Sequence, residues 1–279
     1  MVTFTPKTLS EALEILHTER VVPFAGGTDL MVRRRSWSGT SPDFEYPALF
    51  IGNLEELKEV VKKGDILEIG AAASLGELLE HPEVPEILKQ ALKVMASPAI
   101  RNLGTLGGNI CNSSPAADTL PPLTVLDATL VLQSKEGRRQ VPIGEFIKGP
   151  GRNDLKENEL LSAVRLSLRD YNHSYYKKVG TRKADALSKL SFAGVARTTG
   201  GIIHEVKIAL GAVAPRVVVS VQAEELLKGK SIGDLSKVLP EFKQIYEEYI
   251  RPIDDQRSTA AYRNEVSFRL IEYFITQLK

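Results

Sequence analysis

The pattern of apolar and polar positions divides the chain into short helices and strands. From Thr8 to Glu19 the apolar residues recur at the three- and four-residue spacing of an amphipathic helix. The next segment, residues 21–25, is short and β-rich and ends in Gly26-Gly27, which predicts a strand followed by a glycine turn. The chain therefore begins as helix, strand and turn.

Two capping-box patterns predict the starts of further helices. Each pairs a cap residue with a glutamate three positions later, so that two otherwise unpaired amides are satisfied reciprocally. We expect helices that begin near residues 54 and 75, a strand between them over 66–71, and a third helix over 84–96. The two pairs are Asn53 with Glu56 and Ser74 with Glu77.

The middle of the chain alternates between loop chemistry and strands. Residues 100–122 are rich in Gly, Pro, Asn and Asp, which predicts an ordered loop. A hairpin follows, with strands over 129–134 and 138–141. A polar loop around 150–154 then leads to a strand over 160–168.

Past Asp170 the pattern changes to two long strands and three helices. The strands are expected over 190–197 and 205–213, with a Gly200-Gly201 turn between them. The helices are expected to start near residues 223, 234 and 258, and the last one reaches Gln277. We therefore divide the chain into two domains, residues 1–170 and 171–279.

Composition excludes several classes of function. Of the 279 residues, 36 are Lys or Arg and 35 are Asp or Glu, so a net charge of +1 gives no electrostatic footprint for nucleic acid. The single cysteine, Cys111, and the 4 histidines cannot form a disulfide framework, a thiolate zinc site or an iron–sulfur cluster. We expect no metal site, no membrane span and, without a secretory signal, a cytoplasmic location.

Two glycine turns carry the candidate chemistry. They lie at residues 25–30 and 104–110, and each combines glycines with a threonine and an Asx residue. Glycine permits positive φ, so successive amides can converge on an anion, and two such turns suit a pyrophosphate. An aspartate that pointed into such a loop would repel phosphate, so we expect Asp29 to accept amide hydrogen bonds at the start of the next helix. Taken singly, a Gly-Gly turn is more often only a tight turn, and neither turn fits the Rossmann or P-loop pattern.

Longer strings of sequence resemble a known family. Residues 23–30 read PFAGGTDL, and residues 100–110 read IRNLGTLGGNI and are followed by PAAD at 115–118. These strings resemble the FAD-binding medium subunits and domains of molybdenum hydroxylases, such as xanthine dehydrogenase, aldehyde oxidoreductases and aerobic carbon monoxide dehydrogenase. Later segments continue the resemblance: ELLS at 159–162, KVGTRKAD at 178–185, ALGAVAP at 209–215 and RSTAAYR at 257–263.

The resemblance implies an α+β fold. Residues 1–170 would form a vanillyl-alcohol-oxidase-like (PCMH-type) FAD-binding domain made of two α/β subdomains, about 1–55 and 56–170. Residues 171–279 would form a C-terminal domain like that of the carbon monoxide dehydrogenase flavoprotein, with a small antiparallel sheet and helices.

The resemblance also implies the cofactor, FAD, and its contacts. The two glycine turns would wrap the pyrophosphate with its flanking ribityl and ribose, and Asp118 would contact FAD, since a carboxylate can accept two hydroxyl hydrogen bonds. Leu160 would touch the flavin through backbone and apolar contact, Leu187 would lie against the ring, and Lys178 would stabilise the anionic reduced flavin. The full set is Phe24, Ala25, Gly26, Gly27, Thr28, Asp29, Leu30, Met31, Thr105, Leu106, Gly107, Gly108, Asn109, Asp118, Leu160, Lys178 and Leu187.

Simpler roles exist for three of the candidate residues taken alone. Asp118 could cap a helix before Leu120, and Lys178 could be a solvated lysine at the end of a strand. Cys111 is expected to pack as a small buried side chain and not to take part in redox chemistry.

The function that the resemblance implies is electron transfer. FAD would pass electrons from iron–sulfur clusters on a small subunit to NAD or another acceptor, and a large molybdopterin subunit would hydroxylate the organic substrate. This chain would have no catalytic side chain of its own and would belong to a hetero-oligomer, such as a dimer of heterotrimers. The alternative is a self-sufficient flavoenzyme of the same fold with its own substrate pocket, for which His173, Tyr175 and Tyr176 are loose candidates. A third class, a binding or scaffold protein without cofactor, is disfavoured because both glycine turns are intact.

Overall fold

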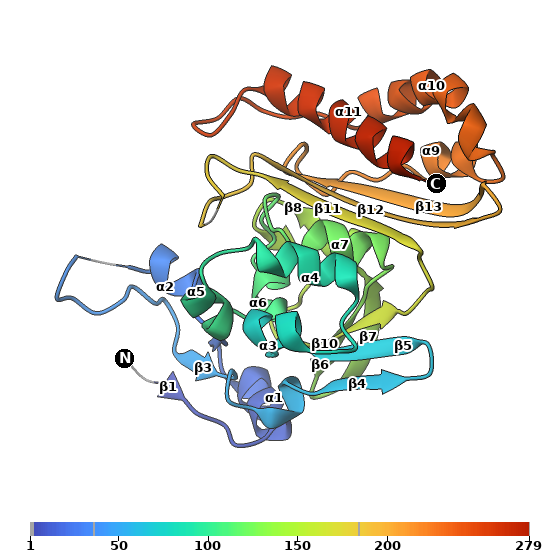
Figure 1. Ribbon diagram of the computed structural model, residues 1–279. Helices are drawn as coiled ribbons and strands as arrows, with labels where there is room; N and C mark the ends of the chain where they lie inside the picture. The colour runs from blue at the N-terminus through green and yellow to red at the C-terminus, as the bar shows by residue number, and fades with distance from the viewer. Residues whose placement is uncertain (1–2, 36, 184, 279) are drawn as a thin grey trace. The chain divides into compact units, whose positions relative to one another are not determined.

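The structure is a computed structural model that describes residues 3–35, 37–183 and 185–278 (Figure 1). The chain divides into two compact units, and each unit is assembled from separated segments. The first unit comprises Met1–Val84, Ala96–Ser113 and Asp127–Ser167. The second comprises Pro85–Met95, Ser114–Leu126 and Leu168–Lys279.

A small parallel sheet and one helix begin the first unit. The sheet has the order β1 (Thr3–Phe4), β3 (Ala48–Phe50), β2 (Val22–Phe24). Helix α1 (Leu9–Thr18) lies within the predicted range 8–19, and its cap residue Thr8 accepts a hydrogen bond from the Glu11 amide. The apolar face of α1 is buried, so the predicted helix and the strand after it are both confirmed. The turn after β2 leads into the short helix α2 (Leu30–Arg33).

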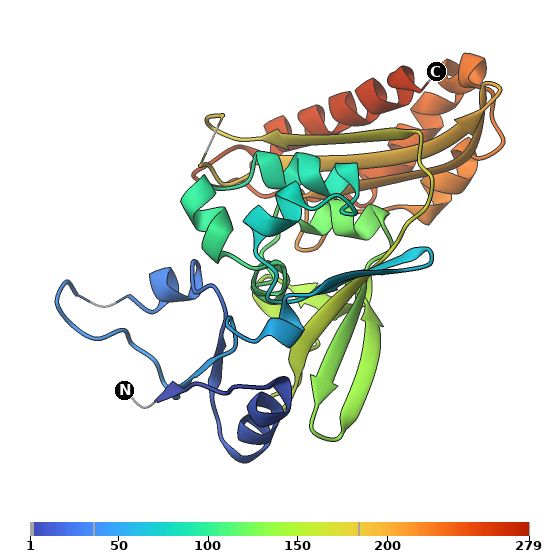
Figure 2. The same ribbon diagram turned by 60° about the horizontal axis from the view of Figure 1, so that its bottom comes forward.

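A five-stranded antiparallel sheet forms the larger part of the first unit (Figure 2). Its order is β4 (Val60–Lys63), β5 (Ile66–Gly70), β10 (Leu160–Ser167), β6 (Thr129–Ser134), β7 (Gly137–Pro142). The predicted hairpin is β6 with β7, and the strands predicted at 66–71 and 160–168 are β5 and β10. Strand β4 was not predicted, because this edge strand is mostly exposed and ends in two lysines.

Short helices replace the loop that the composition of residues 100–122 predicts. They are α5 (Pro98–Leu103), α6 (Leu106–Cys111) and α7 (Leu120–Val125). The prediction was wrong because local caps nucleate single turns: Ser97 and Thr105 cap α5 and α6 with their side chains, and Pro98 occupies the first position of α5. The polar loop near residue 150 also forms a small hairpin of β8 (Ile147–Gly149) and β9 (Arg152–Asn153).

One of the two predicted capping boxes forms. Ser74 and Glu77 make both reciprocal hydrogen bonds at the start of α3 (Leu75–Glu80). The other prediction was wrong: residues Glu55–Leu57 form only a 3-10 turn without a side-chain cap, because the Glu56 carboxylate accepts the amide of Leu9 instead. The four-residue helix α8 (Ile143–Phe146) completes the helices described in this unit.

The second unit is a three-stranded antiparallel sheet with helices on both faces (Figure 1). Its strands, in order, are β11 (His173–Val179), β12 (Leu190–Thr199) and β13 (Ile202–Gly211). One face packs against α9 (Val221–Leu227), α10 (Leu235–Glu247) and α11 (Ala260–Gln277), and a 3-10 turn at Ile232–Asp234 precedes α10. Helix α4 (Glu86–Lys93) and α7 lie on the other face. Strand β11 was missed because its sequence, HSYYKKV, is mostly polar.

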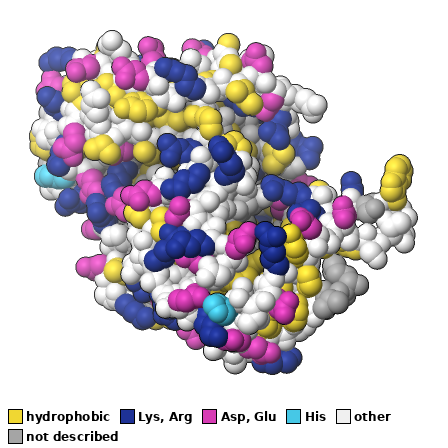
Figure 3. Space-filling view, turned by 180° about the vertical axis from the view of Figure 1, so that it is seen from behind, with side chains coloured by type: hydrophobic (Ala, Val, Ile, Leu, Met, Phe, Trp, Pro, Cys, Tyr) yellow, Lys and Arg dark blue, Asp and Glu magenta, His cyan; other side chains and the backbone are white. Residues whose placement is uncertain are grey.

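On the face shown in Figure 3, positive and negative side chains are mixed: Lys and Arg are interspersed with Asp and Glu. This distribution agrees with the net charge of +1. Within the described ranges, every helix is too short or too polar to cross a membrane.

Candidate functional site

The first glycine turn joins β2 to α2 and packs closely on the end of α5. A Cβ atom added at Gly26 would lie 1.8 Å from the carbonyl oxygen of Leu103. Gly27 has a φ of +68°, in the left-handed region that favours glycine. The ring of Phe24 lies against Gly27, where an added Cβ would come within 2.3 Å of it. Both glycines are therefore required by the geometry of this turn.

The amides of this turn are available to a ligand. In the described part of the chain, the backbone N–H groups of Gly26, Gly27 and Thr28 donate to no protein acceptor. Successive amides without acceptors in a tight turn form a concavity suited to an anion, such as a phosphate group. The first turn therefore fits the pyrophosphate of a dinucleotide.

Asp29 does not take the role that the sequence predicts. It occupies the cap position of α2 but makes no capping hydrogen bond, because its backbone is already helical at φ −102° and ψ −42°. Its carboxylate instead pairs with Arg33, one turn along the helix, at 2.7 Å. Both side chains are more than half exposed, so the pair is a surface contact.

The second glycine turn uses its amides internally. Four successive amides, at residues 106–109, have acceptors within the first unit. The space is also filled, because a Cβ at Gly107 would lie 2.7 Å from the Ala71 carbonyl oxygen. These glycines let α6 approach residues 71–73, so an FAD contact here stays a prediction that rests on side chains and on the resemblance. The four pairs are Leu106 to Ala73 O, Gly107 to Ala71 O, Gly108 to Thr105 Oγ1 and Asn109 to Thr105 O.

Leu160 begins β10, and its side chain belongs to the core of the first unit. It is 2% exposed and lies in the same apolar cluster as Leu13 and Leu16 of α1. Its side chain is therefore committed to packing. Only its backbone remains for the predicted contact with the flavin.

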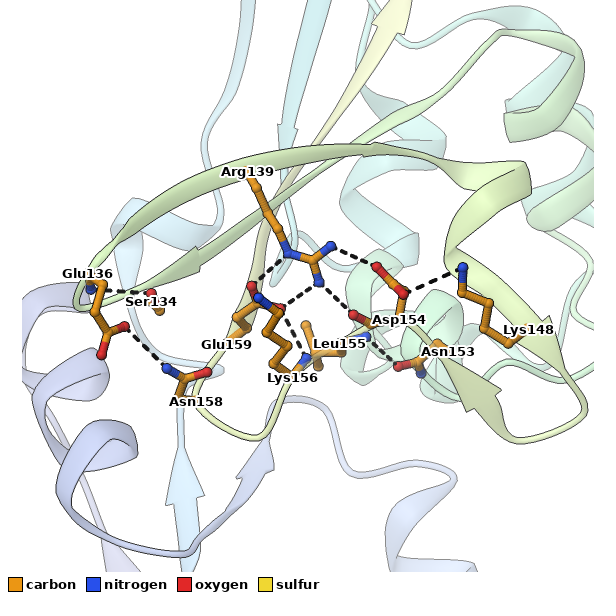
Figure 4. Close-up of polar contacts among 10 residues, drawn as sticks. All are labelled: Ser134, Glu136, Arg139, Lys148, Asn153, Asp154, Leu155, Lys156, Asn158 and Glu159. Atoms are coloured by element: carbon orange, nitrogen blue, oxygen red, sulfur yellow. Dashed lines mark hydrogen bonds and ion pairs between the residues drawn. The ribbon is translucent and has the colours of Figure 1, made fainter.

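A charged network fixes the chain just before Leu160 (Figure 4). The guanidinium of Arg139, on β7, donates from Nε and Nη2 to the two oxygens of Glu159, both at 2.7 Å, and from Nη1 to Asp154 at 2.7 Å. The Glu159 side chain is only 7% exposed. Hydrogen bonds from Arg139 lower the pKa of Glu159, which keeps the carboxylate charged. The sequence gives no local signal for this network, because Arg139 lies 20 residues from Glu159.

Asp118 is the centre of a buried polar cluster in the second unit. Its Oδ2 pairs with Lys178 Nζ at 2.7 Å, and its Oδ1 accepts hydrogen bonds from Tyr176 at 3.1 Å and Ser188 at 2.5 Å. The side chains of Asp118 and Lys178 are 6% and 8% exposed. The simpler roles are therefore wrong: Lys178 is not solvated, and the cap position of α7 belongs to Thr119.

The alternation of β11 builds this cluster. Tyr176 and Lys178 are two residues apart, so both side chains lie on one face of the strand. Tyr176 is buried, and burial together with the Asp118 charge raises its pKa well above the usual value. Its hydroxyl therefore remains a protonated donor to the carboxylate.

The remaining candidates have simpler surroundings. Leu187 directly precedes Ser188 and is 60% exposed. Burial raises the pKa of the Cys111 thiol to about 12, which opposes thiolate chemistry. The ring of Tyr175 packs against Phe192 and Tyr273. No group of three His, Cys, Asp or Glu residues placed to hold a metal ion occurs among the described residues.

Comparison with known proteins identifies the family. Residues 1–167 match the family described as the FAD binding domain in molybdopterin dehydrogenase. The chain belongs to this family. Residues 174–278 match the C-terminal domain of the carbon monoxide dehydrogenase flavoprotein. FAD is therefore the cofactor, and the free amides of the first turn fit its pyrophosphate.

Relatives match the chain over most of its length. It is 31% identical to the glyceraldehyde dehydrogenase medium chain of Sulfolobus acidocaldarius, over 93% of this chain and 92% of the relative. It is 34% identical to the nicotinate dehydrogenase FAD-subunit of Eubacterium barkeri, over 81% and 79%. A chain of carbon monoxide dehydrogenase from Hydrogenophaga pseudoflava superposes with a TM-score of 0.90 at 25% identity, over 100% of this chain and 96% of that one. The predicted α+β, vanillyl-alcohol-oxidase-like fold is confirmed.

Proposed function

We propose that this FAD-binding medium subunit is the exit point for electrons in a molybdenum hydroxylase complex. Electrons would arrive from iron–sulfur clusters on a small subunit and leave to NAD or another acceptor. The organic substrate would be hydroxylated on a large molybdopterin subunit. FAD supplies the redox chemistry, since a flavin can take up single electrons and release a pair as hydride.

The observation that carries this proposal is the match of nearly the whole chain to proteins named as medium chains or FAD-subunits. The match covers 93% of this chain and 92% of the glyceraldehyde dehydrogenase medium chain. The cysteine count supports the same division of labour. One cysteine cannot ligate an iron–sulfur cluster, so any cluster would be held by another chain.

The residues of this chain would bind and orient the cofactor. We assign the amides of Gly26, Gly27 and Thr28 to the pyrophosphate, and Lys178 to the edge of the isoalloxazine ring. An ammonium at the N1–C2 edge favours the anionic reduced flavin. Asp118 accepts three protein hydrogen bonds, so about one of its roughly four acceptor directions is left for an FAD hydroxyl.

The remaining assignments are part of the same proposal. Residues 1–170 would be the FAD-binding domain and 171–279 the C-terminal domain. The complex would be a hetero-oligomer in the cytoplasm, and a dimer of heterotrimers is one form that fits.

The first experiment asks where turnover resides. The purified chain should retain an absorption band at about 450 nm after it is incubated with FAD and the unbound FAD is removed. By itself it should not oxidise purines or aldehydes, whereas the complex assembled with a cysteine-rich small chain and a molybdopterin chain should do so. Turnover by the isolated chain would overturn the proposal in favour of a self-sufficient flavoenzyme.

The second experiment tests the role of Lys178. Lys178→Met removes the positive charge of the side chain and keeps most of its length. The reduction potential of bound FAD, measured by spectroelectrochemical titration, should become more negative. An unchanged potential would remove Lys178 from the flavin environment.

A further inference from the structure

The hydroxyl groups of Tyr176 and Ser188, which donate hydrogen bonds to Asp118, have no role in the function proposed above. We infer that Tyr176 and Ser188 are positioning residues, which hold the Asp118 carboxylate so that it fixes the Lys178 ammonium and thereby sets the reduction potential of bound FAD. This inference rests on the proposed function, because it assumes that Lys178 acts on the flavin.

The division of partners between the two carboxylate oxygens supports the inference. Both hydroxyls donate to Oδ1, and the ammonium donates to Oδ2. Two donors on one oxygen prevent the carboxylate from rotating, so Oδ2 stays directed at Lys178. A lysine has a flexible four-carbon stem and three rotatable donors, so it gains a defined position only from such a fixed partner.

The elements that supply the two hydroxyls are themselves anchored. The Tyr176 amide donates to Gln90 Oε1 of α4 at 2.9 Å, which adds a contact beyond the ladder of β11. Ser188 is buried and lies two residues before β12 begins. The Tyr176 hydroxyl thus comes from β11 and the Ser188 hydroxyl from the segment that leads into β12. Asp118 lies on a third segment, just before α7.

Burial gives the two hydroxyls their electrostatic effect. In a low-dielectric surrounding, hydrogen bonds to a carboxylate spread its charge over more atoms. Without them the negative charge would concentrate on the contact with Lys178 and compensate the ammonium more completely. The positive potential that Lys178 exerts on its surroundings would then fall, and the reduced flavin would be less stabilised.

A purely structural role for the hydroxyls makes a different prediction. If they only satisfy a buried carboxylate, their loss should lower stability but leave the potential of the flavin unchanged. A double-mutant cycle with Lys178 separates the two roles, because residues that act through one partner have non-additive effects.

The experiment measures the reduction potential and the Kd of FAD in the full chain loaded with FAD. Tyr176→Phe and Ser188→Ala each remove one hydroxyl with little loss of packing. Tyr246→Phe is a matched control, because this buried tyrosine of the same unit donates to the Ile208 carbonyl oxygen. Ser267→Ala is the matched control for Ser188→Ala, because the buried Ser267 hydroxyl donates to the Arg263 carbonyl oxygen and not to Asp118.

We expect Tyr176→Phe and Ser188→Ala each to shift the potential to a more negative value, and the two controls to leave it unchanged. In the Lys178→Met background, the same two changes should cause no further shift. Ser188→Thr, which keeps a hydroxyl at this position, should have the wild-type potential.

Two outcomes would overturn the inference. A wild-type potential in both variants would show that the hydroxyls are only structural. Equal shifts with and without Lys178 would show that they do not act through it. If one variant fails to fold, the other still decides between these results. A wild-type chain that retains no flavin band once unbound FAD is removed would instead overturn the proposed function, and is distinguished by that spectrum alone.

Discussion

Replacing Gly26 with alanine tests whether the first glycine turn binds FAD. The new Cβ would lie 1.8 Å from the carbonyl oxygen of Leu103 and 2.7 Å from its carbonyl carbon. Carbon–oxygen contacts need about 3.3 Å, so the turn and the end of α5 must separate by roughly 1.5 Å. Both sides of this contact are backbone, so a side-chain rotation cannot relieve it.

Two consequences of this displacement can be given magnitudes. Overpacking of this kind costs about 1–3 kcal/mol of unfolding free energy. A misplacement of about 1 Å can cost on the order of 100-fold in function, and we expect FAD affinity to fall by at least that factor. The loss would correspond to about 2.7 kcal/mol of binding free energy.

The assay is titration of the purified chain with FAD, followed by flavin fluorescence, with thermal unfolding measured in parallel. Gly144→Ala is the matched control, since no atom lies within 4 Å of its added Cβ and its φ is not positive. The control should bind FAD like the wild type. Wild-type affinity in Gly26→Ala would refute the assignment of the pyrophosphate to this turn.

Three further experiments test contacts elsewhere in the chain. Asp255→Asn leaves the buried Arg263 guanidinium, 2.6 Å from the carboxylate, without its partner, and should cost about 3–5 kcal/mol in urea unfolding. Because a hydrogen bond from Arg263 lowers the pKa of Asp255 to about 2, the charge-dependent part of this stabilisation should be complete above about pH 5 and be lost as the pH falls through the folded pKa, a dependence that the variant should lack. Cys111 should resist thiol reagents at about pH 8 until the chain unfolds, and rapid labelling of the native chain would contradict its raised pKa. Arg139→Gln should lower the unfolding free energy by about 2–3 kcal/mol, and Arg139→Lys should recover only part of it, because lysine cannot donate a fork to Glu159; full recovery would show that the geometry of the fork is unimportant.

Local signals in the sequence predicted the elements that depend on neighbours a few residues away. Ser74 caps its helix as expected, because the Glu77 amide and carboxylate with which it pairs lie within one turn. The capping box predicted at Asn53 does not form, and the reason is a long-range contact. The Glu56 carboxylate that would complete its capping box accepts the amide of Leu9, 47 residues away.

The candidate site shows the same limit. The conformation of the first glycine turn follows from its sequence. In the second turn, the amides of Leu106 and Gly107 donate to the carbonyl oxygens of Ala73 and Ala71, which no local pattern indicates. The two hydroxyls on Asp118 come from 58 and 70 residues away. Spacing along the chain cannot reveal such contacts, because they depend on which face of β11 meets which loop.

The helices α4 and α7 have a consequence for how the chain can be divided. Both come from the middle of the sequence, within residues 1–167, yet they belong to the second compact unit. A fragment that starts at residue 171 would lack them, and would leave the sheet face that carries Tyr176 and Lys178 bare. During synthesis, the strands that bury the leucines of α4 and α7 emerge about 50 to 100 residues later. At roughly 5–20 residues per second, these leucines stay without their partner sheet for several seconds. The boundary between family domains and the boundary between folding units therefore fall at different places in this chain.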